Sequence, residues 1–170
     1  MVSGAATPRR LPELLVSIEL DAEVSDAIKE MARESEDGRE TGGIVLGRGP
    51  DGAGVVHVEC AGDPGPKARR EPGFFLRDLE RAQELADAAW AENKAIWVGE
   101  WHTHVHGDPR PSPTDLATYA GHLAVAELEF EVFVSIIAVP DLERGWEEPL
   151  LAPWLLEISE IPVDAARRAG

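Results

Sequence analysis

The regular alternation of short apolar runs with longer amphipathic segments is the feature that most constrains the fold of this chain. Runs that are rich in β-branched residues or alternate in polarity predict strands, and they cover residues 14–20, 44–46, 54–60, 95–101, 130–139 and 154–158. Segments with apolar residues at helical spacing predict helices, and they cover residues 22–35, 76–93 and 113–123. The order β-α-β-β-α-β-α-β-β predicts an α/β fold in which helices cover a central mixed sheet.

Chain length and local composition predict one domain. The chain has 170 residues, which suits a single domain with a substantial core. We expect this domain to span residues 13–160, with flexible ends at residues 1–12 and 161–170. Residues 61–73 are so rich in proline and glycine that they predict an irregular loop. Asp21 stands where it would cap the first helix.

Charge and composition argue against several classes of function. The net charge is −16, whereas a nucleic-acid surface needs a basic stripe, so we expect no nucleic-acid partner. No apolar run approaches the roughly 20 residues that span a bilayer, so we expect no membrane segment. The first ten residues lack the apolar core of a secretory signal. Cys60 is the only cysteine, which excludes an intramolecular disulfide and favours a cytoplasmic location.

The candidate functional centre begins where the predicted strand 95–101 leads into His102-Thr103-His104. In an extended segment the two histidines point to the same face, and Asp115 follows within one loop. Two imidazole nitrogens and one carboxylate oxygen suit zinc and leave a fourth position for water. The pattern therefore predicts a catalytic Zn²⁺ site with His102, His104 and Asp115 as ligands.

Some members of this set have a purely structural interpretation. Ser112 and Asp115 have the spacing of a capping box at the start of a helix. Asp115 does not easily cap and bind metal at once, whereas Ser112 could cap and still direct its hydroxyl into the site. His106 could be a substitute ligand, a group behind the ligands or an exposed loop residue, and the exposed position is favoured.

Glu40 supplies the group that the ligand set lacks. A zinc hydrolase needs a carboxylate that takes a proton from water and passes it to the leaving amine. Glu40 directly precedes Thr41-Gly42-Gly43, where the missing side chains would let a substrate or a backbone segment approach closely. Without the histidine motif, the same residue would be interpreted as a solvated glutamate at the start of a strand.

Taken together, these residues resemble the JAMM (Jab1/MPN/Mov34) metalloprotease family. The family pattern is a glutamate on an early strand, then His-[Ser/Thr]-His, seven residues, Ser, two residues and Asp, and the chain has Glu40, His102-Thr103-His104, Ser112 and Asp115 at that spacing. The Gly-Glu-Trp-His-Thr-His segment and Phe75-Leu76-Arg77-Asp78 are most similar to stand-alone bacterial JAB-domain proteins. The family usually has proline after the second histidine, where this chain has Val105. Proline there would stiffen the loop but supplies no ligand.

The resemblance covers about residues 14–158 and implies a single-domain JAMM/MPN (cytidine-deaminase-like) fold. It implies a deconjugating peptidase with Glu40 and Ser112 as catalytic residues, Glu40 carrying the proton and Ser112 stabilising the oxyanion. The expected substrate is an amide or isopeptide bond after the C-terminal glycine of a ubiquitin-like protein. Activating- and conjugating-like enzymes are the implied partners, in some relatives within antiphage defence operons. Two loops are either walls of the substrate groove or plain connectors: the loop 61–73, with its Lys67, Arg69 and Arg70, and the loop 105–111.

Two other functions stay open at this point. The first is a peptidase that releases an amino acid, such as cysteine, from a sulfur-carrier protein of ubiquitin fold, for which the site chemistry would be the same. The second is a non-catalytic scaffold, as in JAMM relatives that have lost their ligands. The intact ligand set and Glu40 argue against the scaffold. A relative associated with DNA repair is disfavoured by the acidic composition.

Overall fold

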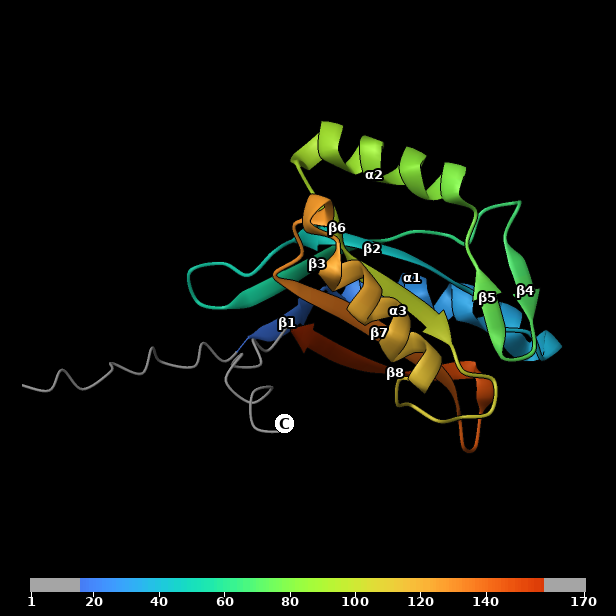
Figure 1. Cartoon of the computed structure of the whole chain (residues 1–170). Coiled ribbons are helices and arrows are strands. Elements are labelled where there is room, and N and C mark those ends of the chain that lie inside the picture. Colours follow the sequence, from blue (N-terminus) through green and yellow to red (C-terminus); the bar gives the residue numbers. More distant parts are fainter. Residues whose placement is uncertain (1–15, 158–170) are drawn as a thin grey trace, which may run out of the picture.

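The computed structural model describes residues 16–157. This part of the chain forms a six-stranded mixed sheet with helices on both faces and a separate two-stranded hairpin (Figure 1). The strands are β1 (Ser17–Leu20), β2 (Gly42–Arg48), β3 (Val55–Ala61), β4 (Arg69–Glu71), β5 (Phe74–Leu76), β6 (Ile96–Thr103), β7 (Val132–Asp141) and β8 (Gly145–Glu157). The helices are α1 (Ala22–Ala32), α2 (Leu79–Asn93) and α3 (Pro113–Ala124), with 3₁₀ turns η1 (Arg33–Asp37) and η2 (Ala126–Leu128). The predicted α/β class is confirmed.

The ends that we expect to be flexible, residues 1–12 and 161–170, lie outside the described residues. The expected domain limits, 13–160, therefore stay a prediction. Within residues 16–157, no helix is both long enough and apolar enough to cross a membrane.

The strand order β1-β3-β2-β6-β7-β8 places β6 inside the sheet. Strand β6 is antiparallel to β2 and parallel to β7. A parallel pair needs a crossover connection, and here the chain leaves β6 through residues 104–112 and returns along α3 before it reaches β7. In α/β sheets, ligands bind where strands end in such crossovers. The topology therefore brings the end of β6 and the start of α3 together.

The helices divide the core into two sides of the sheet. Helix α1 packs its apolar stripe, which includes Val24 and Ile28, against the larger cluster on one face. Helix α2 packs on the opposite face around Leu46, and α3 packs there through Tyr119 on Phe133. Figure 1 shows α3 in front of the sheet and α1 behind it. The candidate site lies on the α3 side.

A β-bulge in β6 determines which face receives the histidines. Val45 of β2 pairs with Gly99, but the next residue, Leu46, pairs with Trp97, so Val98 is the extra residue on β6. Trp97 packs on the side of α2 and α3, whereas Val98 and Trp101 pack on the side of α1. In a regular strand, residues 97 and 101 would share a face. The bulge shifts this alternation by one residue, and His102 then points to the same side as α3.

The prediction that residues 61–73 form an irregular loop is wrong in its second half. Arg69–Glu71 pairs with Phe74–Leu76 as an antiparallel hairpin. Pro72 and Gly73 are the two residues between the strands, and Gly73 has a φ of 74°. Proline followed by a residue with positive φ is the sequence of a type II turn. The proline and glycine here close a hairpin instead of preventing regular structure.

Other element limits differ from the prediction because of local hydrogen bonds. Helix α2 begins at Leu79, three residues later than expected, because Asp78 accepts hydrogen bonds from the backbone of the first turn. Asp21 occupies the N-cap of α1, but its side chain makes no capping hydrogen bond. Strand β8 begins at Gly145, well before the expected residue 154. It contains prolines, which suits its place at the edge of the sheet.

Candidate metal centre

The predicted site residues come from three elements that meet at one end of β6. His102 lies near the end of β6, and His104 follows the last residue of that strand. Asp115 lies in the first turn of α3. Glu40 lies two residues before the start of β2, and Gly42, the first residue of that strand, pairs with His102. The four residues are thus brought together by strand pairing and by the crossover.

The three predicted ligands form a compact group that could hold a metal ion. The Nε2 atoms of His102 and His104 are 2.9 Å apart. Asp115 Oδ1 lies 3.5 Å from His102 Nε2, and Asp115 Oδ2 lies 3.2 Å from His104 Nε2. Bonds of about 2.0–2.1 Å to a tetrahedral zinc ion would place two ligand nitrogens about 3.3 Å apart. The donor types and their separations therefore fit zinc.

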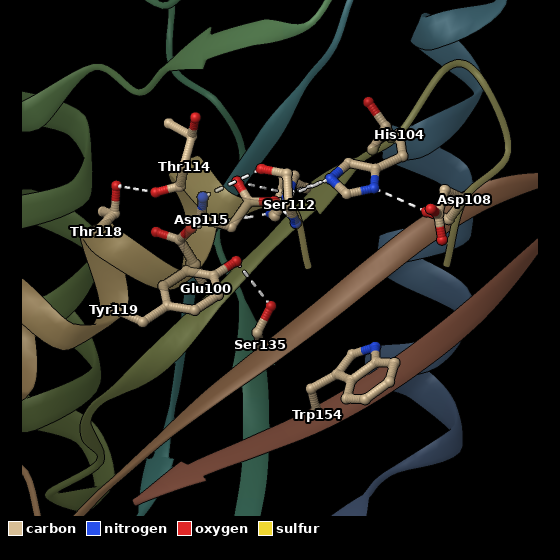
Figure 2. Close-up of polar contacts among 12 residues, drawn as sticks. Glu100, His104, Asp108, Ser112, Thr114, Asp115, Thr118, Tyr119, Ser135 and Trp154 are labelled. Atoms are coloured by element: carbon tan, nitrogen blue, oxygen red, sulfur yellow. Dashed lines mark hydrogen bonds and ion pairs between the residues drawn. The ribbon is translucent and has the colours of Figure 1, made fainter. Parts of the chain in front are cut away.

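Asp115 caps α3 and also faces the histidines, so the expected conflict between these roles is wrong. Asp115 Oδ2 accepts a hydrogen bond from the Ser112 backbone N–H at 2.6 Å. The Asp115 backbone N–H in turn donates to Ser112 Oγ at 3.1 Å, which completes a capping box (Figure 2). Asp115 Oδ1 takes no part in the cap and faces His102. One carboxylate thus serves both purposes, because Oδ2 accepts the cap hydrogen bond and still lies beside His104, while Oδ1 faces His102.

The two histidines are held in different ways. The ring of His104 donates from Nδ1 to the backbone carbonyl of Asp108 at 2.7 Å (Figure 2). This bond leaves Nε2 free to face the ligand group. His102 is only 5% exposed, and its Nδ1 has no hydrogen-bond partner in the described part of the chain. The nearest carboxylate oxygen to that nitrogen, from Glu100, is 3.9 Å away, and Glu100 forms an ion pair with Arg77.

Burial and charge set the protonation of the group. Burial raises the pKa of Glu40, although the nearby charges of His102 and His104 oppose the rise. Burial also acts to raise the pKa of Asp115, but hydrogen bonds from the two histidines outweigh it and hold that pKa well below its usual range. For His104, burial acts to lower the pKa, but hydrogen bonds to Asp115 and to the Asp108 carbonyl outweigh it, and the pKa is raised. A partly buried carboxyl with a raised pKa beside a metal-binding group suits a general base.

The backbone around Glu40 is held by the β4–β5 hairpin. The Glu40 N–H donates to the Glu71 carbonyl at 3.0 Å, and Arg70 Nε donates to the Glu40 carbonyl at 3.2 Å. The Arg70 guanidinium also donates a hydrogen bond to each carboxylate oxygen of Asp37. Of the three basic residues considered for a substrate groove, Arg70 thus binds other parts of this chain, namely the Glu40 carbonyl and Asp37. Lys67 and Arg69 form ion pairs with Glu80 and Glu71.

Gly42 and Gly43 are required by neighbouring parts of the protein. A Cβ atom at Gly42 would lie 2.4 Å from the Trp101 carbonyl oxygen and 2.8 Å from the Cβ of His102. A Cβ atom at Gly43 would lie 2.1 Å from the Gly62 carbonyl oxygen. The missing side chains were expected to admit either a substrate or a backbone segment, and the structure shows a backbone segment close to each glycine. His106 is exposed and does not belong to the ligand group.

Similarity to known proteins agrees with this architecture. A sequence model of the family described as prokaryotic homologs of the JAB domain matches residues 21–148. This chain belongs to that family. A solved structure of similar fold is that of protein DSY2949 from Desulfitobacterium hafniense, determined in solution. The two chains share 23% sequence identity, with a TM-score of 0.55 over 82% of this chain and 84% of the other. No curated protein sequence matches the chain.

Membership of the JAB family confirms the JAMM/MPN fold that the sequence motif implies. The family includes JAMM metalloproteases as well as inactive members, so membership alone does not establish catalysis. The sequence marks Arg70 only as a possible residue of a substrate groove, and it predicts neither the bond from Arg70 to the Glu40 carbonyl nor the Arg77–Glu100 ion pair. Their partners lie 23 or more residues away along the chain, and no local pattern marks such contacts.

Proposed function

We propose that this JAB-domain chain is a zinc metallopeptidase that cleaves an amide or isopeptide bond after the C-terminal glycine of a ubiquitin-like protein. The observation that carries the proposal is the convergence of Glu40 with His102, His104 and Asp115 at one end of β6. Three ligands alone would also serve a structural ion. A partly buried carboxyl with a raised pKa beside them supports hydrolysis, because the reaction needs a proton carrier at that place.

Each residue of the site would have a separate role in hydrolysis. His102, His104 and Asp115 would hold the metal, which supplies Lewis acidity and lowers the pKa of water to about 7. Glu40 would accept a proton from the attacking water and return it to the departing amine. The Ser112 hydroxyl would donate a hydrogen bond to the oxyanion that forms at the scissile carbonyl. Its oxygen receives the Asp115 N–H, so its own proton stays available for this bond.

The substrate class is supported by the resemblance to bacterial JAB-domain peptidases of deconjugation systems. The tail of a ubiquitin-like protein is extended and would be bound well along exposed strand backbone. Activating- and conjugating-like enzymes would then be functional partners, and an antiphage defence system is one setting that relatives suggest.

Replacing Glu40 with glutamine tests the proposal directly. The variant E40Q should still bind one zinc ion, because Glu40 is not among the ligands. Its cleavage of ubiquitin-like fusion proteins should fall by about 10²–10⁴-fold, because a general base of this kind contributes that much. The exposed Glu36 offers a matched control, and E36Q should cleave as the unaltered protein does. Chelator should abolish cleavage, and added zinc should restore it.

The substrates in this assay distinguish the remaining functions. Linear fusions and isopeptide conjugates of a ubiquitin-like protein test deconjugation, and a sulfur carrier with a C-terminal cysteine tests the related peptidase. Cleavage of only the sulfur carrier would replace the proposed substrate but keep the mechanism. Purified protein with near-zero zinc content that cannot be loaded would support the scaffold. Full cleavage by E40Q would remove Glu40 from its proposed role.

A further inference from the structure

His104 depends on the loop that follows it. Its backbone N–H donates to the Ala138 carbonyl of β7, but its ring is oriented by the carbonyl of Asp108, four residues further along. His102, by contrast, is enclosed within β6 and nearly inaccessible. The orientation of the His104 ring therefore depends on the position of the Asp108 carbonyl, at the end of the ring away from Asp115.

The loop 105–111 has few restraints of its own. A turn closes at its start, where the Gly107 N–H donates to the His104 carbonyl at 3.0 Å. Asp108 accepts hydrogen bonds from the backbone N–H and the guanidinium of Arg110, but the two side chains are 74% and 51% exposed. Exposed pairs of this kind contribute little to stability. Val105, the second residue of that turn, leaves its backbone without the fixed φ that a proline would supply.

Trp154 of β8 supplies a restraint from outside the loop. Its indole Nε1–H donates to the Pro109 carbonyl at 2.8 Å, directly after the carbonyl that orients His104. Within residues 16–157, it is the only hydrogen bond that joins the loop 105–111 to a strand of the sheet. Trp154 pairs in register with Ser135, which pairs with Glu100 of β6. The three side chains thus form a row across the sheet, on the face that carries the ligands (Figure 2).

We propose that Trp154 is a positioning residue for the metal ligand His104. Its hydrogen bond to Pro109 fixes the loop, the adjacent Asp108 carbonyl then fixes the His104 ring, and Nε2 is held toward Asp115. Trp154 lies on the edge strand β8, and β7 separates that strand from β6. At ordinary strand spacing, β8 is about 10 Å from β6. Trp154 lies beyond residues 21–148, which the family model matches.

The experiment compares the zinc affinity of the unaltered chain with that of the variant W154F, which keeps an aromatic ring but loses the N–H donor. Partners that orient metal ligands typically contribute 10–100-fold to affinity, and we expect the lower end, about a tenfold loss, because Trp154 acts through one further carbonyl. Cobalt(II) absorption should also change, since it reports ligand geometry. Backbone amides of residues 105–111 should exchange faster with solvent. W90F removes the same group from an exposed position on α2 and should change none of these readouts.

A second variant distinguishes loop restraint from general damage. Val105 is the second residue of the turn closed by His104 and Gly107, a position that favours proline. The double variant W154F/V105P should therefore regain most of the lost zinc affinity. Unchanged zinc affinity and amide exchange in W154F would overturn the proposal, as would a loss that V105P does not reduce.

This inference rests on the proposed zinc site, but the two fail differently. If the unaltered protein binds zinc, depends on Trp154 and cleaves nothing, the proposed peptidase function fails and the positioning role stands. If it cleaves its substrate and W154F binds zinc equally well, only the positioning role fails.

Discussion

Replacing Ser112 with alanine separates two roles that one side chain combines. Ser112 Oγ accepts the Asp115 N–H at 3.1 Å, and the Ser112 N–H donates to Asp115 Oδ2 at 2.6 Å. The variant S112A removes the first hydrogen bond and leaves the second, because the second uses only the backbone of residue 112. The ligand carboxylate therefore keeps its own hydrogen bond from the Ser112 backbone N–H, and zinc should still bind.

The structural and the catalytic effects have different sizes. Loss of an N-cap side chain costs about 1 kcal/mol of unfolding free energy. In a protein of this length, about 1 kcal/mol lowers the Tm by about 2–4 °C. If the hydroxyl also donates to the oxyanion, turnover should fall by about 10²–10³-fold, which corresponds to about 3–4 kcal/mol in the barrier. Capping alone cannot produce so large a loss of turnover.

Three measurements on the same preparation test this reasoning. Denaturant unfolding gives the capping effect, metal analysis gives zinc content, and cleavage of a ubiquitin-like fusion gives kcat. The variant S112T keeps the hydroxyl and is an acceptable cap, so it should retain most of both functions. Full turnover in S112A would show that Ser112 acts only as a cap. Loss of zinc would show that the Ser112 hydroxyl is needed to hold Asp115 in place. A fall of much more than about 2 kcal/mol in the free energy of unfolding would show that Ser112 contributes more than a helix cap.

Two further predictions concern the sheet. A Cβ atom at Gly99 would lie 1.9 Å from the Val134 carbonyl oxygen of β7, so G99A should lower the free energy of unfolding by about 3 kcal/mol or more. A Cβ atom at Gly121 would have no atom within 4 Å, so the control G121A should be neutral or stabilising by up to about 1 kcal/mol. Equal denaturation midpoints for the two variants would contradict this prediction. A hydrogen bond to Asp51, together with the charge of Glu19, raises the pKa of His57 above 6.5. Protonation of His57 therefore favours the folded state at low pH, and this contribution disappears as pH rises through the raised pKa. H57Q should thus lower the Tm at about pH 5.5 and have little effect at about pH 8.5, and a difference independent of pH would refute the assignment.

The group that could hold a metal ion was predictable because its signals are local. The alternation along 95–101 orients the two histidines, and the spacing of Ser112 and Asp115 places both in one helical turn. Period and capping are properties of a few neighbouring residues, so they can be recognised without the fold. Glu40 was recognised through the chemistry that a zinc hydrolase needs and through the family pattern, and the structure brings it beside the ligands.

The sequence could not indicate which face of the sheet receives His102. The extra residue at Val98 becomes visible only when β6 is paired with β2, because a bulge is a mismatch between two strands and not a property of one. The β4–β5 hairpin was missed for a related reason. Its proline and glycine are compatible with a loop or a turn, and pairing of the flanking residues selects the turn.

By itself, then, the sequence determines the order of elements, the ligand types and the capping box at Ser112 and Asp115. Only the tertiary structure determines how the ligands are held. Arg70 reaches the Glu40 carbonyl across 30 residues, and Trp154 reaches Pro109 across 45 residues. These contacts use backbone carbonyls as acceptors, and a carbonyl is present at every residue. Since the acceptor leaves no mark in the sequence, only the folded chain reveals which side chain binds it.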